Sequence, residues 1–313
     1  MGKLAFVFPG QGAQYVGMAK DIVENYPAAA EVFAAASDRL GYDMKELVFE
    51  GPEEKLKITQ NTQPAILTAS WAICKAVETA GVKPDCTAGL SLGEFTAHVL
   101  AGSLNFADAA ALVEKRGKFM QEEVPEGVGG MTAVIALDEE TVEAVCKEVS
   151  DTGYVACANY NCPGQIVISG ELKALAAAGE LLAEKGAKRV IPLKVSAPFH
   201  CNLLKGAGKK LEVELESINI GNMEIPVYAN VTGGKISSEN EIKGLLVDQV
   251  SNTVKWTNTI RNMIAGGVDT FIEIGPGKVL SGLIKKTDRS VTIMNVENME
   301  TLETVLEFLK AVK

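Results

Sequence analysis

Short apolar runs alternate with long helical patterns along most of this chain, and this alternation restricts the folds that it can adopt. The apolar segment KLAFVF (3–8) is followed by helical patterns over residues 28–41, 65–81 and 107–123. Strands separated by crossover helices are typical of a layered α/β fold with a mostly parallel sheet. The chain has 313 residues, 47% of them hydrophobic, so it can bury a substantial core. We therefore predict the α/β class.

A stretch rich in glycine, EVPEGVGG (123–130), separates this first part of the chain from a second pattern. Beyond it the predicted elements follow the order strand, helix, strand, strand, helix, strand, which is the order of a ferredoxin-like unit. The chain then returns to longer helices. We therefore predict a large α/β domain formed by residues 1–126 and 197–313, with a small ferredoxin-like (βαββαβ) subdomain inserted at residues 127–196.

The charge and the apolar runs of the chain indicate which classes of partner it can bind. The net charge is −10 and no block of Lys or Arg is present, which disfavours nucleic acid and anionic membranes. The apolar runs are far shorter than the roughly 20 residues that cross a bilayer, and the N-terminal pattern does not match a signal peptide. We expect a cytoplasmic protein with no membrane partner.

The six cysteines lack Cys-x-x-Cys spacing, which predicts reduced thiols and no metal site.

The segment GLSLG (89–93) places Ser91 between two glycines, a pattern typical of a nucleophile elbow. In such an elbow a strand turns sharply into a helix, and small neighbours permit the bend. A helical pattern follows, so Ser91 is expected at a helix N-terminus, beside free backbone N–H groups and the positive end of the helix dipole. The Leu92 amide is the expected donor to an oxyanion at this position.

A serine nucleophile needs a base, and the chain contains two histidines, His98 and His200. His98 lies seven residues along the helix predicted to begin at Ser91, a rise of about 10 Å, whereas a base must come within about 3 Å of the hydroxyl. By elimination the predicted base is His200. Either Asp248 or a backbone carbonyl could orient its imidazole, and the residues alone leave that choice open.

Eight segments, taken together in their order and spacing, resemble the malonyl-CoA:acyl carrier protein transacylases of fatty acid synthesis, nearly from end to end of the chain. These segments are FPGQGAQ (8–14), TQPAI (62–66), GLSLGE (89–94), KRGKFMQ (115–121), NCPGQIVISG (161–170), SAPFH (196–200), NVTG (230–233) and IEIGPG (272–277). So many motifs in the family's order make the resemblance highly specific.

This resemblance implies a hydrolase-like α/β core with an inserted ferredoxin-like subdomain and a cleft between the two. It implies that Ser91 is the nucleophile and His200 its base, and that the amides of Gln11 and Leu92 form the oxyanion hole. It also implies that the main-chain carbonyl of Gln249 orients the histidine, so that no triad acid is required.

The resemblance also assigns two residues to the acyl pocket. Arg116 matches the family arginine that binds the malonyl carboxylate. Composition alone would favour a solvated helix position for it, but a planar guanidinium can hold a carboxylate through two hydrogen bonds in a dry pocket. The neighbouring Gly117 is expected to let the substrate approach. Phe199 resembles the residue found at this position in malonyl-type polyketide acyltransferases, and is expected to favour malonyl over branched acyl groups.

The implied activity is transfer of the malonyl group from malonyl-CoA to the phosphopantetheine thiol of an acyl carrier protein through malonyl-Ser91, by a monomer without metal or cofactor. Carrier proteins of this pathway are acidic, so a local basic dock is expected near the cleft, with candidate residues Lys188, Arg189, Lys285 and Lys286. Three alternatives remain: a discrete acyltransferase of a polyketide pathway, a serine hydrolase of thioesters, and a non-catalytic carrier-binding module.

Two positions depart from the family pattern. Leu90 stands where the family commonly has a histidine before the nucleophile, so any polar contact made by that imidazole is absent. Thr253 stands where relatives often have proline, and is expected to loosen the loop that presents Gln249. Neither change touches Ser91 or His200, so modest effects are expected.

Overall fold

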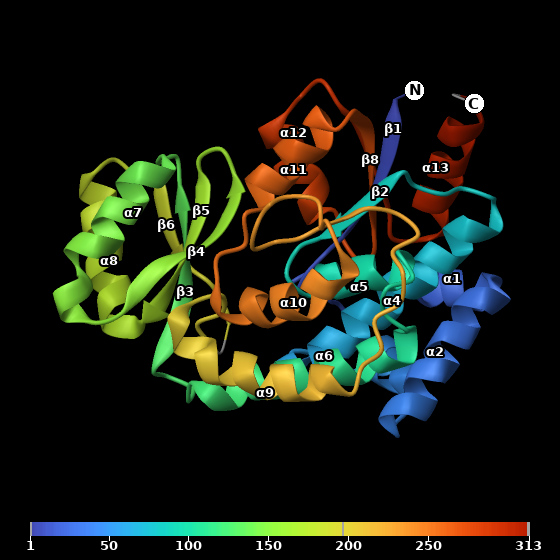
Figure 1. Ribbon diagram of the computed structural model, residues 1–313, viewed down its shortest axis with the longest axis horizontal. Coiled ribbons are helices and arrows are strands. Elements are labelled where there is room, and N and C mark those ends of the chain that lie inside the picture. The colour runs from blue at the N-terminus through green and yellow to red at the C-terminus, as the bar shows by residue number, and fades with distance from the viewer. Residues whose placement is uncertain (1, 196, 312–313) are drawn as a thin grey trace.

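The computed structural model describes residues 2–195 and 197–311, which contain two sheets (Figure 1). The larger sheet has five parallel strands in the order β7-β2-β1-β8-β9. The predicted mostly parallel α/β core is therefore confirmed. Its strands are β1 (Lys3–Phe8), β2 (Cys86–Gly89), β7 (Val227–Tyr228), β8 (Val268–Ile274) and β9 (Thr292–Val296).

Helices cover both faces of this sheet, and β1 shows how the sequence requires this. Leu4, Phe6 and Phe8 pack into the core formed with α4 and α5, whereas Ala5 and Val7 pack against α11 and α12. Successive side chains of a strand point to opposite faces, so a strand that is apolar throughout must be covered on both. The helices of this unit are α1 (Lys20–Asn25), α2 (Pro27–Leu40), α3 (Glu53–Leu56), α4 (Thr59–Thr79), α5 (Leu92–Leu100), α6 (Phe106–Glu123), α9 (Lys205–Glu216), α10 (Ile242–Ser251), α11 (Trp256–Ala265), α12 (Val279–Thr287) and α13 (Met299–Ala311). Short π or 3-10 turns lie at Glu46–Glu50, Ser150–Thr152, Asn202–Leu204 and Glu239–Glu241.

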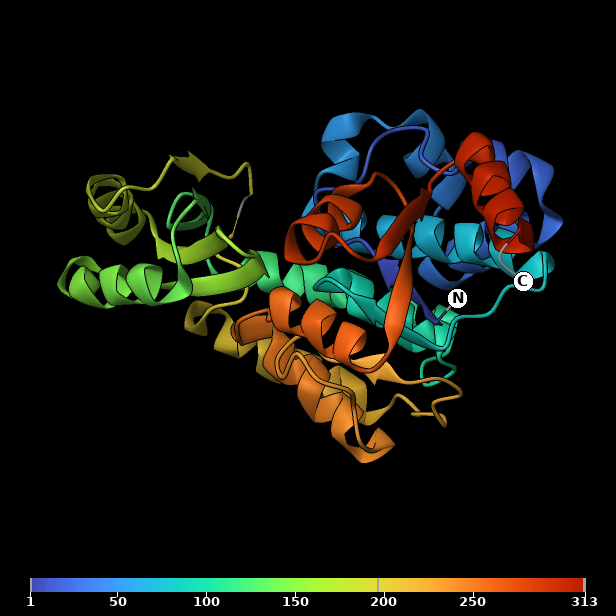
Figure 2. The same cartoon turned by 90° about the horizontal axis from the view of Figure 1, so that it is seen from above.

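The second sheet is antiparallel and lies at one end of the molecule (Figures 1 and 2). Its strand order is β4-β5-β3-β6, and two helices pack on one face, so the predicted βαββαβ arrangement is confirmed. On the other face, Met131, Ala133 and Val167 join the core of the larger unit. Its elements are β3 (Gly129–Ile135), α7 (Glu139–Glu148), β4 (Val155–Cys162), β5 (Gln165–Glu171), α8 (Leu172–Glu184) and β6 (Arg189–Pro192).

The two units are joined where the loop after α10 runs beside β4. The Val254 amide donates to the Ala158 carbonyl at 2.8 Å, and the Tyr160 amide donates to the Val254 carbonyl at 3.0 Å. The Thr253 hydroxyl donates to the Cys157 carbonyl at 2.8 Å. The Thr253 hydroxyl thus supplies a hydrogen bond to the second sheet, and the expectation that Thr253 loosens this loop stays a prediction.

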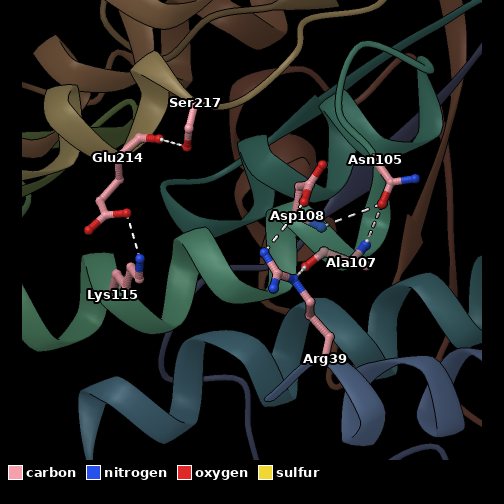
Figure 3. A network of polar contacts seen from close by, with 7 residues as sticks. All are labelled: Arg39, Asn105, Ala107, Asp108, Lys115, Glu214 and Ser217. Carbon is pink, nitrogen blue, oxygen red and sulfur yellow. Dashed lines mark hydrogen bonds and ion pairs between the residues drawn. The ribbon is translucent and has the colours of Figure 1, made fainter. Parts of the chain in front are cut away.

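The N-terminus of α6, the helix that carries the predicted carboxylate-binding arginine, is fixed by polar contacts from two directions (Figure 3). The Asn105 side chain caps the helix by accepting from the amides of Ala107 at 2.9 Å and Asp108 at 3.4 Å. Arg39 of α2 donates to the Ala107 carbonyl at 3.3 Å and pairs with Asp108 at 3.5 Å. An N-terminal cap satisfies N–H groups that have no intrahelical acceptor, so the start of α6 is well defined.

Two further contacts fix the middle of α6. Lys115 forms an ion pair of 2.5 Å with Glu214 of α9 (Figure 3). On the opposite side, Gly117 packs against the start of α4 so closely that an added Cβ would lie 2.6 Å from the Thr59 carbonyl oxygen and 2.9 Å from Gln60 Cα. The expectation that Gly117 makes room for substrate is therefore wrong: its missing side chain makes room for a neighbouring helix.

Replacing Gly117 by Ala should lower the free energy of unfolding by about 1–3 kcal/mol, because the added methyl overpacks the contact between α6 and α4. Gly244→Ala, within α10, is the matched control, since nothing lies within 4 Å of the position that an added Cβ would take there. That control should raise stability by up to about 1 kcal/mol through helix propensity. Urea unfolding of both variants measures the difference, and equal stabilities would contradict the packing argument.

Candidate active site

Ser91 lies at the sharp turn between β2 and α5, with backbone angles φ 53° and ψ −108°. Such a conformation costs a non-glycine residue about 1–3 kcal/mol, so the surroundings must enforce it. The flanking glycines are obligatory: a Cβ on Gly89 would lie 1.9 Å from the Gly93 carbonyl carbon, and a Cβ on Gly93 would lie 2.1 Å from the Phe8 carbonyl oxygen. The segment GLSLG therefore forms the strand-to-helix elbow that its sequence predicts.

Asn230, in the loop after β7, holds this elbow in place. Its side-chain oxygen accepts from the Ser91 amide at 2.6 Å, and its side-chain nitrogen donates to the Gly89 carbonyl at 2.7 Å. One buried amide thus satisfies the polar groups that the turn leaves without backbone partners. Analysis of the sequence did not identify this residue, although it opens the quoted segment NVTG.

His200 is 4% exposed and its Nε2 atom lies 2.7 Å from Ser91 Oγ. Its Nδ1 atom lies 2.8 Å from the main-chain carbonyl oxygen of Gln249. A carbonyl can only accept, so Nδ1 carries the proton and Nε2 is free to accept from the serine hydroxyl. Of the two groups considered for orienting the ring, the carbonyl of Gln249 occupies the position, whereas Asp248 is exposed on α10.

His98, the second histidine, does not contact Ser91 or His200. His98 is fully buried within α5, and its Nδ1 atom contacts Ser103 Oγ at 2.8 Å. Burial lowers the pKa of His98 to about 3. Burial, and next the charge of Arg116, likewise lower the pKa of His200 to about 3, while its bond to Gln249 raises it. Both rings are therefore neutral at neutral pH, as a base that accepts a proton from serine must be.

Arg116 projects from α6 into the same site and is 1% exposed. Its Nη1 atom donates to Gln63 Oε1 at 2.7 Å, and its Nη2 atom donates to Gln249 Oε1 at 2.8 Å and to Ser91 Oγ at 3.2 Å. Its guanidinium carbon lies 5.4 Å from the centre of the Phe95 ring. Burial lowers the pKa of Arg116 to about 10, so the group remains charged at neutral pH. Among the described residues, no carboxylate forms an ion pair with it.

A buried carboxyl group lies behind these residues. Glu94 of α5 is 0% exposed, and its Oε2 atom accepts from Gln249 Nε2 at 2.5 Å and from the Asn230 amide at 3.2 Å. Burial raises the pKa of Glu94 to about 7, against the lowering effects of these hydrogen bonds and of Arg116. Glu94 and Gln63 both lie inside quoted segments, GLSLGE and TQPAI, but nothing in the sequence shows that they meet Gln249 and Arg116.

A cavity of about 200 Å³ opens beside Ser91, between the two sheets. From the larger unit, the cavity is lined by Gln11, Leu90, Arg116, Phe199 and His200. The second sheet contributes the side chains of Met131, Asn159, Asn161, Gln165 and Val167. The two sheets thus enclose one cleft around the serine hydroxyl. Leu90 adds an apolar wall to this cavity.

The predicted oxyanion donors lie on either side of the elbow. Leu92 is the first residue of α5, so its N–H has no intrahelical acceptor. Gln11 lines the cavity, and its side chain is held by a 3.2 Å hydrogen bond to Thr59 Oγ1. Within the described part of the chain, neither the Leu92 nor the Gln11 amide has a hydrogen-bond partner. Both are therefore available to a ligand.

The remaining predicted features are placed as follows. Ser196, the first residue of the segment SAPFH, lies outside the described residues. All six cysteines are free and buried. Within residues 2–195 and 197–311, no group of three or more His, Cys, Asp or Glu side chains is arranged to hold a metal ion, and no helix is long and apolar enough to cross a membrane.

A family model described as the acyl transferase domain matches residues 5–309. The chain belongs to this acyl transferase family. The malonyl CoA-acyl carrier protein transacylase of Bacillus subtilis (strain 168) is 47% identical to it over 311 residues, which cover 99% of this chain and 98% of that protein. The resemblance inferred from the eight segments is thereby confirmed.

Solved structures agree with this family assignment. The malonyl CoA-acyl carrier protein transacylase of Clostridium perfringens superposes with a TM-score of 0.97 at 50% identity, covering 99% of this chain and 98% of that one. Another transferase, described as a malonyl-transacylase in complex with its type II PKS acyl-carrier protein, superposes with a TM-score of 0.95 at 46% identity, covering 98% and 99% of the two chains. The hydrolase-like core with its second sheet is therefore the architecture of these acyl transferases.

The buried neutral histidines predict a specific acid sensitivity. Each has a folded pKa below the value near 6.5 of an unfolded chain, so the unfolded state binds more protons below that pH and stability falls as pH falls. In His98→Asn, whose amide can still meet Ser103, the slope below pH 6.5 should be shallower by up to about 1.4 kcal/mol per pH unit. His200→Asn is the matched comparison, expected to flatten the slope similarly. Urea unfolding between pH 4.5 and 8 measures both, and an unchanged slope in His98→Asn would show that His98 is not buried neutral.

Proposed function

We propose that this acyl transferase transfers a malonyl group from malonyl-CoA to the phosphopantetheine thiol of an acyl carrier protein. One observation carries the choice of acyl group: Arg116 is buried, charged and 3.2 Å from Ser91 Oγ, with neutral oxygens as its hydrogen-bond acceptors. An acyl group that carries its own carboxylate can pair directly with this cation, which no carboxylate of the described residues does. The names of the relatives support the same donor and acceptor.

In the first half-reaction, His200 Nε2 accepts the Ser91 proton as Oγ attacks the thioester carbon. The carbonyl oxygen becomes an oxyanion, which the amides of Gln11 and Leu92 stabilise, a contribution of about 3–4 kcal/mol per donor. The intermediate collapses by breaking the carbon–sulfur bond, and the departing CoA thiolate takes the proton from His200. The products are malonyl-Ser91 and CoA as a thiol.

The second half-reaction repeats these steps with the carrier thiol as the nucleophile. His200 accepts the thiol proton, the sulfur attacks the ester carbon, and the carbon–oxygen bond to Ser91 breaks. Ser91 Oγ then regains the proton from His200. Because the acyl group waits on Ser91 between donor and acceptor, the kinetics are ping-pong. Neither half-reaction as written needs a metal or a cofactor, and a monomer contains every group named.

Acyl selection follows from charge and shape. Acetyl would leave the buried Arg116 guanidinium with no carboxylate in direct contact, and a site built for a polar group can reject an analogue that lacks it by about 10⁴-fold. Phe199 lines the same cavity. Its ring is proposed to occupy the space that a branched acyl group would need.

The carrier is proposed to dock on a group of basic side chains near the cavity. Lys188, Arg189, Lys285 and Lys286 are the residues proposed to form this dock. Lys286 contacts Gln165 Oε1 at 3.2 Å, and Gln165 lines the cavity beside Val279 and Leu283. An acidic carrier could therefore be held by charge while its pantetheine arm enters the cavity.

A carrier of a polyketide pathway is the second candidate acceptor. The observation that favours it is the structural relative described as bound to a type II PKS acyl-carrier protein. The chemistry at Ser91 would be unchanged, so only the docking surface and carrier preference separate the two candidates. Comparing transfer rates to fatty acid and polyketide carriers decides between them.

Brief incubation with malonyl-CoA should add one malonyl group to the wild-type protein and none to Ser91→Ala, because the hydroxyl is the proposed acceptor. Acetyl-CoA and methylmalonyl-CoA should leave far less adduct. Intact-protein mass spectrometry measures all three donors. Malonylation of the Ser91→Ala protein would reject the scheme, and loss of malonyl to water as fast as to carrier would instead support the hydrolase.

Reversing the charge of the dock, as in Arg189→Glu with Lys286→Glu, should raise the apparent KM for the carrier about tenfold or more at low salt, because exposed charges steer association. The rate of Ser91 malonylation by malonyl-CoA should not change. Lys310→Glu with Lys20→Glu, in α13 and α1, is the matched control for net charge. If both double variants raise the KM equally, the proposed dock is wrong.

A further inference from the structure

The mechanism above does not use the carboxyl of Glu94, a buried ionisable group beside the nucleophile. It is 0% exposed and lies in α5, one turn beyond the nucleophile. Its Oε2 atom accepts from Gln249 Nε2 at 2.5 Å and from the Asn230 amide at 3.2 Å, while its Oε1 atom has no partner among the described residues. Burying a carboxyl group in this way is costly, so its presence at the site needs a physical reason.

Gln249 is the residue through which Glu94 reaches the site. Its main-chain carbonyl accepts from His200 Nδ1 at 2.8 Å, and its side-chain Oε1 accepts from Arg116 Nη2 at 2.8 Å. Its Nε2 atom donates to Glu94 and also to the Ser91 carbonyl at 3.0 Å. One residue therefore contacts the base, the cation and the nucleophile's backbone.

The orientation of the Gln249 amide decides whether these contacts exist. If the amide turned over, its NH₂ group would face the Arg116 guanidinium, and two sets of donors would meet. Glu94, when ionised, can only accept, so it binds the amide nitrogen and leaves the oxygen toward Arg116. The carboxylate thus selects one of the two amide orientations.

Placing Gln249 between the two charges also keeps Arg116 out of a direct ion pair with Glu94. A carboxylate in direct contact with the guanidinium would occupy the donors that an incoming acyl carboxylate needs. Through the intervening amide, Glu94 stabilises the cation without forming an ion pair with it. The groups that act on the Glu94 carboxyl are Gln249 of α10, Asn230 of the loop after β7 and the Arg116 cation of α6.

We propose that Glu94 is a positioning residue of the acyl pocket, whose carboxylate fixes the Gln249 side chain and so holds Arg116 in place for an acyl carboxylate. This inference rests on the proposed malonyl transfer. It assigns to Glu94 a part in acyl selection that requires its negative charge, and it predicts that a neutral residue of the same shape impairs the malonyl donor more than the acetyl donor.

Glu94→Gln should lower kcat/KM for malonyl-CoA about tenfold to a hundredfold at pH 8, the effect of one charge-assisted hydrogen bond. The low rate with acetyl-CoA should change less than threefold, so the ratio of the two donors should fall. The deficit should shrink as pH decreases and vanish near pH 5.5, where the wild-type carboxyl is itself protonated. The pKa of His200 is about 3, so its protonation cannot cause this change between pH 8 and 5.5. The pKa of Glu94 is about 7, which lies within that range.

Two comparisons separate positioning from a general loss of structure. Thr96→Val removes a fully buried, unpartnered hydroxyl from the same helix and should leave both donors unaffected. In a Gln249→Met background, which keeps the main-chain carbonyl, Glu94→Gln should have little further effect on malonyl transfer. Equal losses with both donors at every pH, or an undiminished loss in the Gln249→Met background, would overturn the inference. Absence of a malonyl adduct on the wild type would instead overturn the proposed function.

Discussion

The active site is organised around keeping one cation, Arg116, out of water. Burial of a guanidinium is unfavourable unless its donors are satisfied, and here its acceptors are side-chain oxygens of two glutamines and one serine, with the Phe95 ring nearby. These acceptors come from helices far apart in the sequence. The cation can therefore sit beside Ser91 only if these segments are held at fixed separations, and the close contact at Gly117 fixes α6 against α4.

The backbone around Ser91 is strained, and buried amides stabilise it. Ser91 and His200 both have positive φ, at 53° and 58°. Asn230 bonds the two polar groups of the elbow, and Gln249 fixes the histidine through its own main chain. Neither amide is charged, so these bonds hold the elbow and the histidine without adding charge of their own beside the serine.

Local patterns predict the layers, the second sheet and the elbow, whereas the polar network depends on which distant segments meet. Helix geometry alone rejects His98 as the base, because it places that residue too far along α5. Nothing in the sequence distinguishes the Gln249 carbonyl from any other, so the choice between it and Asp248 required either the family resemblance or the structure. The partners of Glu94 likewise lie on other elements. Gly117 is a case where a local pattern misleads. Because it adjoins Arg116, it is expected to leave room for substrate, but its missing side chain instead allows α6 to pack against α4.

In the proposed mechanism, the placement of Arg116 links acyl selection to the strength of His200 as a base. Its charge is one of the causes that lower the pKa of His200, after burial. A carboxylate bound to the guanidinium would cancel much of that field, so the pKa of His200 would rise toward the value that suits a general base. An acetyl group would leave the field in place and the imidazole a weaker base. If the proposed donor is correct, malonyl is therefore favoured twice, in its binding to Arg116 and in the basicity of the histidine that activates Ser91.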